Sequence, residues 1–435
     1  MNHGLNAEIL AVAAGCVVLW SVLSARLERF NVSAPIAFVV MGIVVTHGPL
    51  AFVHFSPHSE SVKSLAEVTL ALVLFTDASR VNIHELRADV GLPVRLLAIG
   101  LPLSIGFGTA IAFGIIPGMT LWVAATVGAI VAPTDAALGS AIMSDERVPN
   151  RIRRLLNVES GLNDGIATPF VNLFLAGAIS SEVAYGPSIA SAVSELAVGA
   201  GVGLGLGLIG GWVLSVTRSH GWAAKPSESL VAPALALAGY SLALVLHGNG
   251  FIAAFIAGIA FGSVLHGDLA PLVEFGEEAG GLLSLLVWLI FGAAMVIPGF
   301  EHATWADVAF AVLALTIIRM VPVAISLLGS GLDRVTVSFI GWFGPRGLAS
   351  VVFGLIAFDT LDPTAGSQVL AIVTVTITLS VVAHGISASP LAARYGRFAA
   401  TLSAHGPEHQ PTPIMRAHGA KQRPPTPQTN DDRAS

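Results

Sequence analysis

Charged residues are scarce in this sequence: Asp, Glu, Lys and Arg make up 11% of its 435 residues, whereas 54% are hydrophobic. A soluble domain usually has about 25% charged residues. So few polar side chains cannot cover a water-exposed globule of this length, and most of the exterior must therefore face lipid. The net charge of −6 argues against a nucleic-acid-binding surface.

Cysteine is nearly absent as well. The single Cys16 excludes an internal disulfide and a cysteine-rich metal site, and its apolar neighbours favour a buried hydrophobic role. Basic residues are missing before the first apolar run, so we do not expect the N-terminus to be a cleavable signal peptide.

Apolar stretches dominate what is present. A helix that crosses the ~30 Å hydrocarbon core needs about 20 mostly apolar residues, and roughly thirteen such stretches lie between polar residues, Gly or Pro. The sequence therefore predicts an all-α polytopic membrane protein with about thirteen transmembrane helices, called spans below. The predicted spans are 7–25, 34–53, 62–80, 92–116, 119–143, 152–180, 189–217, 229–247, 251–266, 272–298, 304–329, 334–358 and 366–393.

Basic residues alternate between the predicted connections, as the positive-inside rule requires. One set of connections carries Arg26, Arg80, the Arg147–Arg154 cluster and Arg218, whereas opposite loops such as "PGMT" and "HGNG" carry no Lys or Arg. This pattern predicts an N-terminus outside and a C-terminus inside the cell, in the plasma (inner) membrane. Residues 399–435 are rich in Pro, Gln and His without apolar periodicity, which predicts a disordered cytosolic tail.

Five charged residues are predicted near the middle of a span, where each charge costs about 2.5–3.5 kcal/mol even on the lenient insertion scale. Pairing alone does not explain them, because three acids and two bases leave one negative charge. A surplus carboxylate in a low-dielectric cavity needs a proton or a metal cation, which is the chemistry of a site where the two compete. The five residues are Asp135, Glu159, Asp164, Arg319 and Arg346.

The sixth span carries the motif "NVESGLNDG". Glu159 and Asn163 are four residues apart and share one helix face, and Ser160 and Asp164 share an adjacent face in the same way. A hydroxyl beside a carboxylate provides hard oxygen ligands of the kind that Na⁺ prefers. Glu159 is then the natural partner of an arginine.

Two spans are interrupted near the middle of the membrane. The fifth contains Pro133 in "VAPTDAALG", and the twelfth contains Gly344 and Pro345 in "WFGPRGLAS". Proline removes a backbone donor and clashes with the preceding turn, and interrupted backbone at this depth is tolerated where it lines a cavity or packs in protein. Either break alone is compatible with a simple kink. Two breaks seven spans apart predict inverted repeats, spans one to six and eight to thirteen, joined by a linker helix at 186–225.

At this point the sequence resembles the cation:proton antiporter superfamily, specifically the bacterial sodium/proton exchangers related to eukaryotic NHE-type exchangers. The resemblance covers residues 7–395. It is carried, in content, order and spacing, by "PTD" in span five, "ESGLNDG" in span six, the mid-span Arg319 and "GPRGL" in span twelve.

The resemblance implies two domains. Spans four to six and eleven to thirteen (91–185 and 301–398) would form a core transport domain in which the two broken helices cross. Spans one to three and eight to ten (1–90 and 226–300) would form a dimerisation domain. The protein is accordingly expected to be a homodimer in lipid.

The resemblance also implies roles for single residues. Asp164 would bind the cation, taken to be Na⁺, or the proton, and an Asn-Asp pair at 163–164 goes with electroneutral one-for-one exchange. The assisting ligands would be Thr134, Asp135 and Ser160; the charge-paired or stabilising residues would be Glu159 with Arg319, together with Asn163 and Arg346.

The end of span three departs from some relatives, which place a Glu after the Phe as an added ligand. Here "VLFTDAS" offers Thr76 at that position and Asp77 one residue later, about 100° around the helix. Two roles for Asp77 stay open: it serves the ion site, or it pairs with Arg80 at the cytosolic boundary.

Other functions compete with antiport. An intramembrane hydrolase needs a Ser/His or paired-Asp arrangement, and neither Gly-x-Ser-Gly nor Gly-x-Gly-Asp occurs. A passive channel usually shows carbonyl or acidic rings, and no TVGYG-like filter is present. We therefore expect a transporter without a cofactor, not an enzyme. Proton-coupled transport of another solute on the same fold stays open, as does the choice among Na⁺, K⁺ and Li⁺.

Overall fold

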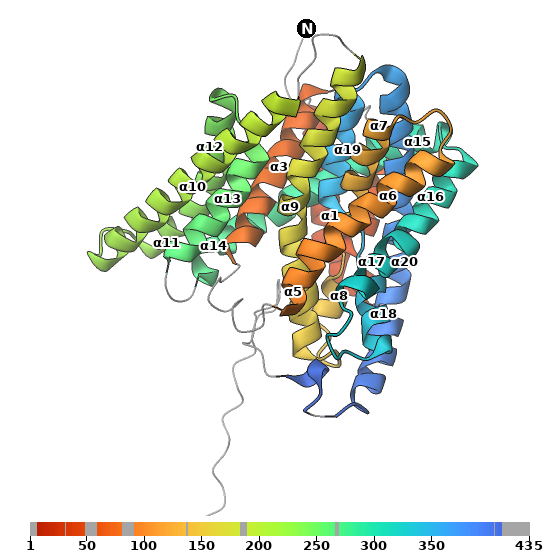
Figure 1. The fold of residues 1–435 in the computed structure, drawn as a ribbon. Coiled ribbons are helices and arrows are strands. Elements are labelled where there is room, and N and C mark those ends of the chain that lie inside the picture. The colour runs from red at the N-terminus through yellow and green to blue at the C-terminus, as the bar shows by residue number, and fades with distance from the viewer. Residues whose placement is uncertain are drawn as a thin grey trace, which may run out of the picture.

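The computed structural model describes residues 7–30, 32–47, 59–80, 91–135, 138–182, 189–265, 269–403 and 405–410 (Figure 1). Every regular element in these ranges is a helix, so the all-α prediction is confirmed. Eight helices are long and apolar enough to cross a membrane, and four shorter helices are apolar too. The helix α3 (Glu60–Ser79) completes the predicted thirteen spans.

The first seven spans extend from the N-terminus to the middle of the chain. Span four changes from α-helix to π-helix and back, and span five consists of two separate helices. In chain order, the elements are α1 (Ala7–Glu28), α2 (Ala34–His47), α3, α5 (Gly91–Arg95), η2 (Leu96–Gly100), α6 (Leu101–Ile115), α7 (Leu121–Val131), α8 (Ser140–Met143), α9 (Asn150–Glu182) and α10 (Ile189–Ser219).

The last six spans follow the same pattern, with a π-helical segment in span ten and two separate helices in each of spans eleven and twelve. The elements are α11 (Lys225–Glu228), α12 (Val231–Val245), α13 (Gly250–Val264), α14 (Ala270–Ile290), η3 (Phe291–Val296), α15 (Ile297–Glu301), α16 (Trp305–Leu315), α17 (Ile317–Ser326), α18 (Arg334–Trp342), α19 (Leu348–Thr360), α20 (Pro363–Ala399) and the short η4 (Pro407–His409).

The predicted interruptions of spans five and twelve are present. Helix α7 ends at Val131 and α18 ends at Trp342, each shortly before the proline that the sequence places there. A third interruption, at Thr316 between α16 and α17, lies inside the continuous span predicted at 304–329. Thr316 has φ −113° and ψ −92°, far from helical values.

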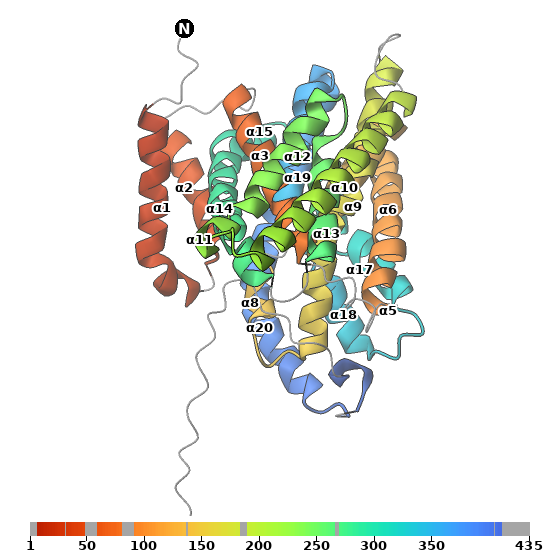
Figure 2. The same ribbon diagram turned by 90° about the vertical axis from the view of Figure 1, so that its left-hand side faces the viewer.

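The helices pack as two groups. In one group, α3 packs against α12, α13 and α14, and α2 packs against η3 and α14; in the other, α7 packs against α6 and α9, and α20 against α16 and α19. The groups meet where α3 contacts α9 and α19 and where α15 contacts α20. Figure 2 shows α1 and α2 at one edge of the molecule and α6 at the opposite edge.

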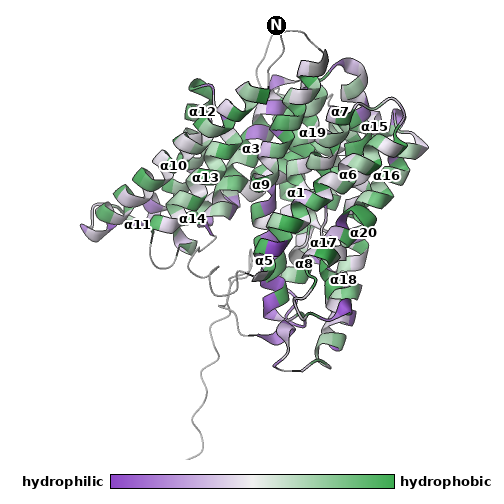
Figure 3. Ribbon diagram, in the orientation of Figure 1, coloured by the Kyte–Doolittle hydropathy of each residue, from purple (hydrophilic) through white to green (hydrophobic). Residues whose placement is uncertain are grey.

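Hydropathy follows this arrangement. In Figure 3, hydrophobic residues predominate along most of the length of the helices, whereas hydrophilic residues gather around the lower ends of α9, α18 and α20. Large apolar side chains on α1 and α10 are exposed, including Val22 at 75% and Trp212 at 62%. Such surfaces belong in contact with lipid rather than water.

Span seven, predicted as a linker helix, packs along α13 through a row of glycines. Gly199, Gly203, Gly207 and Gly211 recur every four residues on one face of α10. A Cβ atom at any of them would meet α13 or the residue preceding it. Small residues at this spacing let two membrane helices approach closely.

The tail begins later than predicted. The sequence predicts disorder for residues 399–435, but η4 folds back against the start of α9, where Arg151 Nη1 donates to Pro407 O. The side chain of Glu408 is 3% exposed, and its Oε1 accepts hydrogen bonds from Asp333 N and Thr336 Oγ1 at 2.8 and 3.2 Å. Composition missed this segment because a few anchoring contacts, rather than apolar periodicity, hold it. Residues 411–435 lie outside the described residues.

The glycine row generates a stability prediction. Gly207→Leu forces a side chain against Ala257 and Ala260, and overpacking of this kind costs about 1–3 kcal/mol. The thermal unfolding midpoint in detergent is expected to fall. Gly205→Leu is the matched control on the same helix, because nothing lies within 4 Å of a Cβ at that position. Equal midpoints for the two variants would contradict close α10–α13 packing.

Candidate functional site

The unwound parts of spans five and twelve lie against each other. The backbone N–H of Asp135 donates to the carbonyl of Pro345 at 2.8 Å. Four half-helices therefore surround one point: α7 and α8 in span five, α18 and α19 in span twelve. Peptide groups at such ends have no intrahelical partner, and at this depth they cannot rely on water.

A carboxylate caps the start of α19 from the other span. Asp135 Oδ2 accepts from Leu348 N at 2.9 Å, and its Oδ1 accepts from Leu138 N at 3.2 Å. A negative group suits the N-terminus of a helix, where the peptide dipoles leave a partial positive charge. Gly347 permits the approach, because a Cβ there would overlap the Asp135 carboxylate.

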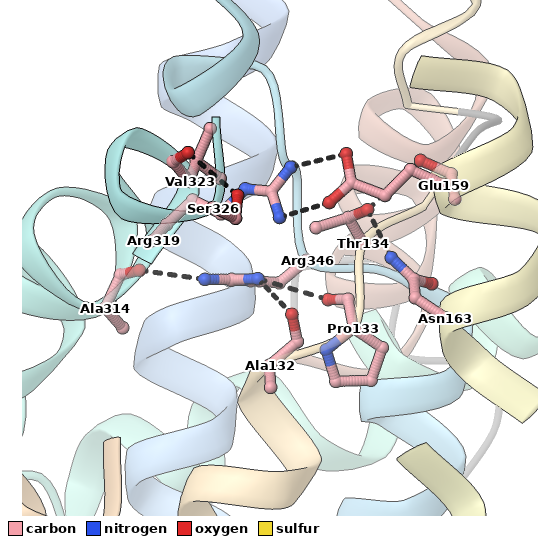
Figure 4. A network of polar contacts seen from close by, with 11 residues as sticks. Ala132, Pro133, Thr134, Glu159, Asn163, Ala314, Arg319, Val323, Ser326 and Arg346 are labelled. Carbon is pink, nitrogen blue, oxygen red and sulfur yellow. Dashed lines mark hydrogen bonds and ion pairs between the residues drawn. The ribbon is translucent and has the colours of Figure 1, made fainter. Parts of the chain in front are cut away.

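An arginine caps the end of α7 in the reverse sense. Arg346 Nη1 donates to the carbonyls of Ala132 and Pro133 at 2.6 and 3.3 Å, and Nη2 donates to Ala314 O at 2.9 Å. Figure 4 shows the guanidinium extended between these carbonyls. Ala314 lies at the third interruption, so the unpredicted break before α17 supplies an acceptor for Arg346. The charge of each broken span thus stabilises a half-helix of the other.

Glu159 and Arg319 form a bidentate ion pair between α9 and α17. Arg319 Nη1 donates to Glu159 Oε1 at 2.5 Å, and Nη2 donates to Oε2 at 2.8 Å. The residues are 2% and 3% exposed. Parallel bonds of this kind fix orientation as well as charge. The pair lies next to Thr134, beside the point where the unwound parts of spans five and twelve meet, which is called the crossing below (Figure 4).

Three buried polar side chains join α9 to the unwound part of span five. Asn163 Nδ2 donates to Thr134 Oγ1 at 2.7 Å, and Thr134 Oγ1 lies 3.1 Å from Ser160 Oγ. Asn163 Oδ1 is buried without a hydrogen-bond partner among the described residues. This network holds the side chain of Ser160, which lines a cavity.

The cavity has a volume of about 670 Å³ and lies between the two groups of helices. One wall comes from the α1–α2 connection, α3 and α14, and the other from α9 and the crossing. Among the described residues, its carboxylates are Glu28, Asp77, Asp135, Asp164 and Glu277, and no described Lys or Arg lines it. Negative potential in a low-dielectric cleft concentrates cations.

Asp164 differs from the other charges at this depth. Its carboxylate lines the cavity, and within the described ranges it has no hydrogen-bond or ion-pair partner. Asp77 lines the same cavity, while Arg80 forms an ion pair with Glu277 on α14. The cavity therefore brings together all the predicted ligands: Thr134 through its bond to Ser160, and Asp77, Asp135, Ser160 and Asp164 directly.

Several groups at the crossing were not anticipated from the sequence. Most of them are backbone atoms, which the residue type does not identify as binding groups: Leu348 N, Ala132 O and Ala314 O. Ser380 was missed too; its Oγ accepts from Arg346 N at 2.7 Å.

Far from the cavity, near the start of α3, Lys63 Nζ lies 2.8 Å from Asp359 Oδ2 of α19.

The described residues contain no group of three or more His, Cys, Asp or Glu side chains able to hold a metal ion. The oxygens near Asp164 are hydroxyls and carboxylates on separate elements. Such a set suits a weakly held hard cation better than a tightly bound transition metal.

A family described as "Sodium/hydrogen exchanger, transmembrane" matches residues 16–394. Among curated proteins, the chain is 24% identical to the "K(+)/H(+) antiporter NhaP" of Alkalimonas amylolytica over 90% of this chain and 67% of that protein. It is 24% identical to the "K(+)/H(+) antiporter NhaP2" of Shewanella baltica over 80% of this chain and 59% of that protein. It is 25% identical to the "Na(+)/H(+) antiporter ApNhaP" of Aphanothece halophytica over 81% and 68%. The chain thus spans about three fifths to two thirds of these relatives' length.

A solved structure, that of the sodium proton antiporter MjNhaP1 from Methanocaldococcus jannaschii at pH 8, has the same fold. It superposes with a TM-score of 0.72 at 19% identity, over 87% of this chain and 98% of that one.

The buried pair generates a prediction. Truncating either Glu159 or Arg319 leaves the partner's charge buried and alone, which typically costs about 3–5 kcal/mol. Each single variant is therefore expected to be poorly stable in a thermal unfolding assay. The swap Glu159→Arg with Arg319→Glu is expected to recover part of the loss. If the destabilisations of the two single variants simply add in the swap, the two side chains do not interact.

Proposed function

We propose that this chain, which belongs to the transmembrane sodium/hydrogen exchanger family, is a secondary antiporter that exchanges a monovalent cation for protons by alternating access. The family assignment agrees with the motif resemblance and makes the chain a transporter rather than an enzyme. One observation carries the proposal. At mid-membrane depth, Asp164 faces the cavity without a bonded partner in the described chain, whereas the other charges there are bonded.

The charges divide as follows. Glu159 and Arg319 neutralise each other. Asp135 and Arg346 carry opposite signs and lie on helix ends of the matching polarity. One carboxylate, Asp164, is left to be neutralised by whatever enters. A proton and a monovalent cation each supply one positive charge, so that binding of either excludes the other, and reorientation of the neutral site gives one-for-one exchange.

The nearest cation ligands support this role. Ser160 Oγ lies on the same helix face as Asp164 and is held by Thr134. Together with Asp135 and, at the mouth, Asp77, these groups offer oxygen ligands only. The named relatives include both Na⁺/H⁺ and K⁺/H⁺ antiporters, so we take Na⁺ as the first substrate to test and K⁺ as the alternative.

Alternating access requires two bodies that move relative to each other. We infer that spans four to six and eleven to thirteen move as the core against spans one to three and eight to ten, because the cavity lies between these groups. On the predicted topology, with the N-terminus outside and the C-terminus in the cytosol, the cavity opens toward the cytosol. The Lys63–Asp359 pair then joins the two groups on the outer side.

The exposed apolar faces of α1 and α10 supply surface for lipid and for a second copy of the chain. A homodimer in the plasma membrane is consistent with spans one to three and eight to ten serving as a fixed scaffold. A proton-coupled carrier of another solute is the competing proposal; it too requires Asp164 but predicts that alkali cations alone drive no proton flux.

Asp164 is expected to be indispensable. Asp164→Asn keeps the shape of the side chain and removes its titratable charge, so cation-driven proton flux in proteoliposomes should vanish while expression and thermal stability persist. Asp145→Asn, in the loop before α9 where Asp145 pairs with Arg147, is the control and should exchange normally. Normal exchange by Asp164→Asn would overturn the proposed mechanism.

A single shared site also fixes the dependence on pH and voltage. Each proton that binds blocks one cation, so the half-saturating cation concentration should rise as pH falls, approaching about tenfold per pH unit. The rate of Na⁺-driven proton flux should be the same at every potential clamped with K⁺ and valinomycin. A rate that scales strongly with voltage, or two protons per cation, would show that a second carboxylate such as Asp135 carries its own proton.

A further inference from the structure

Helix α20 contacts both sides of the break in span twelve. Trp342, the last residue of α18, is held twice: its carbonyl lies 2.9 Å from His384 Nε2, and its indole Nε1 donates to Ser387 Oγ at 3.0 Å. Past the break, Arg346 N donates to Ser380 Oγ at 2.7 Å. His384 and Ser380 are one turn apart on α20 and almost fully buried, with exposures of 1% and 0%.

The hydrogen bonds form one chain when the ring carries its proton on Nε2. His384 Nε2–H then donates to the carbonyl of Trp342, and Nδ1, 3.2 Å from Ser380 Oγ, accepts the hydroxyl proton. Ser380 Oγ keeps its lone pairs for the N–H of Arg346. The Ser380 carbonyl, 2.9 Å from Nδ1, lies inside α20, where the intrahelical bond already satisfies it. The Trp342 carbonyl lies at the end of a helix, where it accepts from Gly344 N at 2.9 Å, and its second lone pair is available to His384 Nε2–H.

The segment between these two anchors supplies groups to the transport site. Arg346 extends from it to cap α7, and Leu348 N, which follows it, binds the carboxylate of Asp135. Pro345 O accepts from Asp135 N. A shift of this segment would therefore move both charges that neutralise the half-helix ends, together with Leu348, which lines the cavity.

We propose that His384 and Ser380 are positioning residues of the transport site: the two side chains clamp the unwound segment 343–347 onto α20 and so fix Arg346 and the start of α19. The transport consequence rests on the proposed antiport; the clamp itself does not. Neither residue touches the cation. The clamp keeps the crossing rigid while the core reorients, so that the cation meets the same ligands from either side.

The clamp is tested first without transport, by hydrogen–deuterium exchange of the purified full chain. His384→Leu removes the donor to Trp342 at similar size, and Ser380→Ala removes the acceptor for Arg346 N–H. The amides of Gly344, Arg346, Gly347 and Leu348 are expected to exchange about tenfold faster or more in both variants. Ser380→Ala leaves the Arg346 N–H unbonded, and His384→Leu removes the side-chain anchor at Trp342 and so loosens the segment. Thr376→Val is the matched control, since Thr376 is buried on the same helix and its hydroxyl has no partner among the described residues. Exchange at the wild-type rate in both variants would overturn the clamp.

The second measurement separates positioning from mere folding. In proteoliposomes, His384→Leu and Ser380→Ala are expected to raise the half-saturating cation concentration about tenfold, whereas partial misfolding lowers only the maximal rate. His384→Gln, whose amide can still donate to Trp342 O, should restore affinity most of the way. An unchanged half-saturating concentration in both variants, or no recovery with Gln, would refute the positioning role. A wild-type protein that exchanges no cation would refute antiport instead, and the amide exchange result would still decide the clamp.

Discussion

Peptide groups at the ends of helices that stop inside the membrane impose the governing constraint on this protein. Each such end leaves amides or carbonyls without intrahelical partners, and a buried unpaired group costs several kcal/mol in hydrocarbon. At the crossing, each span supplies hydrogen-bonding partners for the other. Asp135 from span five accepts a hydrogen bond at the start of α19, and Arg346 from span twelve donates hydrogen bonds at the end of α7. Because each solution depends on the other span, neither broken helix is stable in isolation. The positions of α16, whose Ala314 carbonyl accepts from Arg346, and of α20 follow from the same requirement.

This arrangement also determines what the remaining charges can do. With the helix ends satisfied and Glu159 bonded to Arg319, a carboxylate at Asp164 does not need to stabilise the fold. It sits on α9 one turn beyond Ser160 and faces the cavity. A residue whose charge does not stabilise the fold can change its protonation state or bind an ion without unfolding its surroundings. Separating the charges that hold the crossing from the charge that titrates lets one small volume combine rigidity with exchange.

Much of the fold could be predicted from the sequence, because hydrophobic run length reports membrane helices directly and prolines mark two of the interruptions. The charge imbalance, counted from residue types alone, predicted one surplus carboxylate, and the spacing of Ser160 and Asp164 together with the family resemblance pointed to Asp164. Three features could not be predicted. The break at Thr316 has no Gly or Pro next to it, since the nearest proline is Pro322 inside α17, and only the backbone conformation reveals it. The folding of residues 405–410 depends on Glu408 reaching Asp333 and Thr336, which no local pattern encodes. His384 resembles any structural histidine in an apolar helix until its partner, a carbonyl of α18, is known.

The Lys63–Asp359 contact joins α3 to α19, at the opposite end of α3 from Asp77, and both side chains are partly exposed, at 27% and 29%. If the groups that carry α3 and α19 separate on that side in every turnover, this ammonium and carboxylate part each time. An ion pair in contact with water is worth at most about 1 kcal/mol and weakens as dissolved ions shorten the Debye length, about 8 Å at physiological ionic strength. Salt on that side would thus have two effects. It supplies the transported cation, and it screens the Lys63–Asp359 ion pair, which shifts the equilibrium between the two orientations of the core.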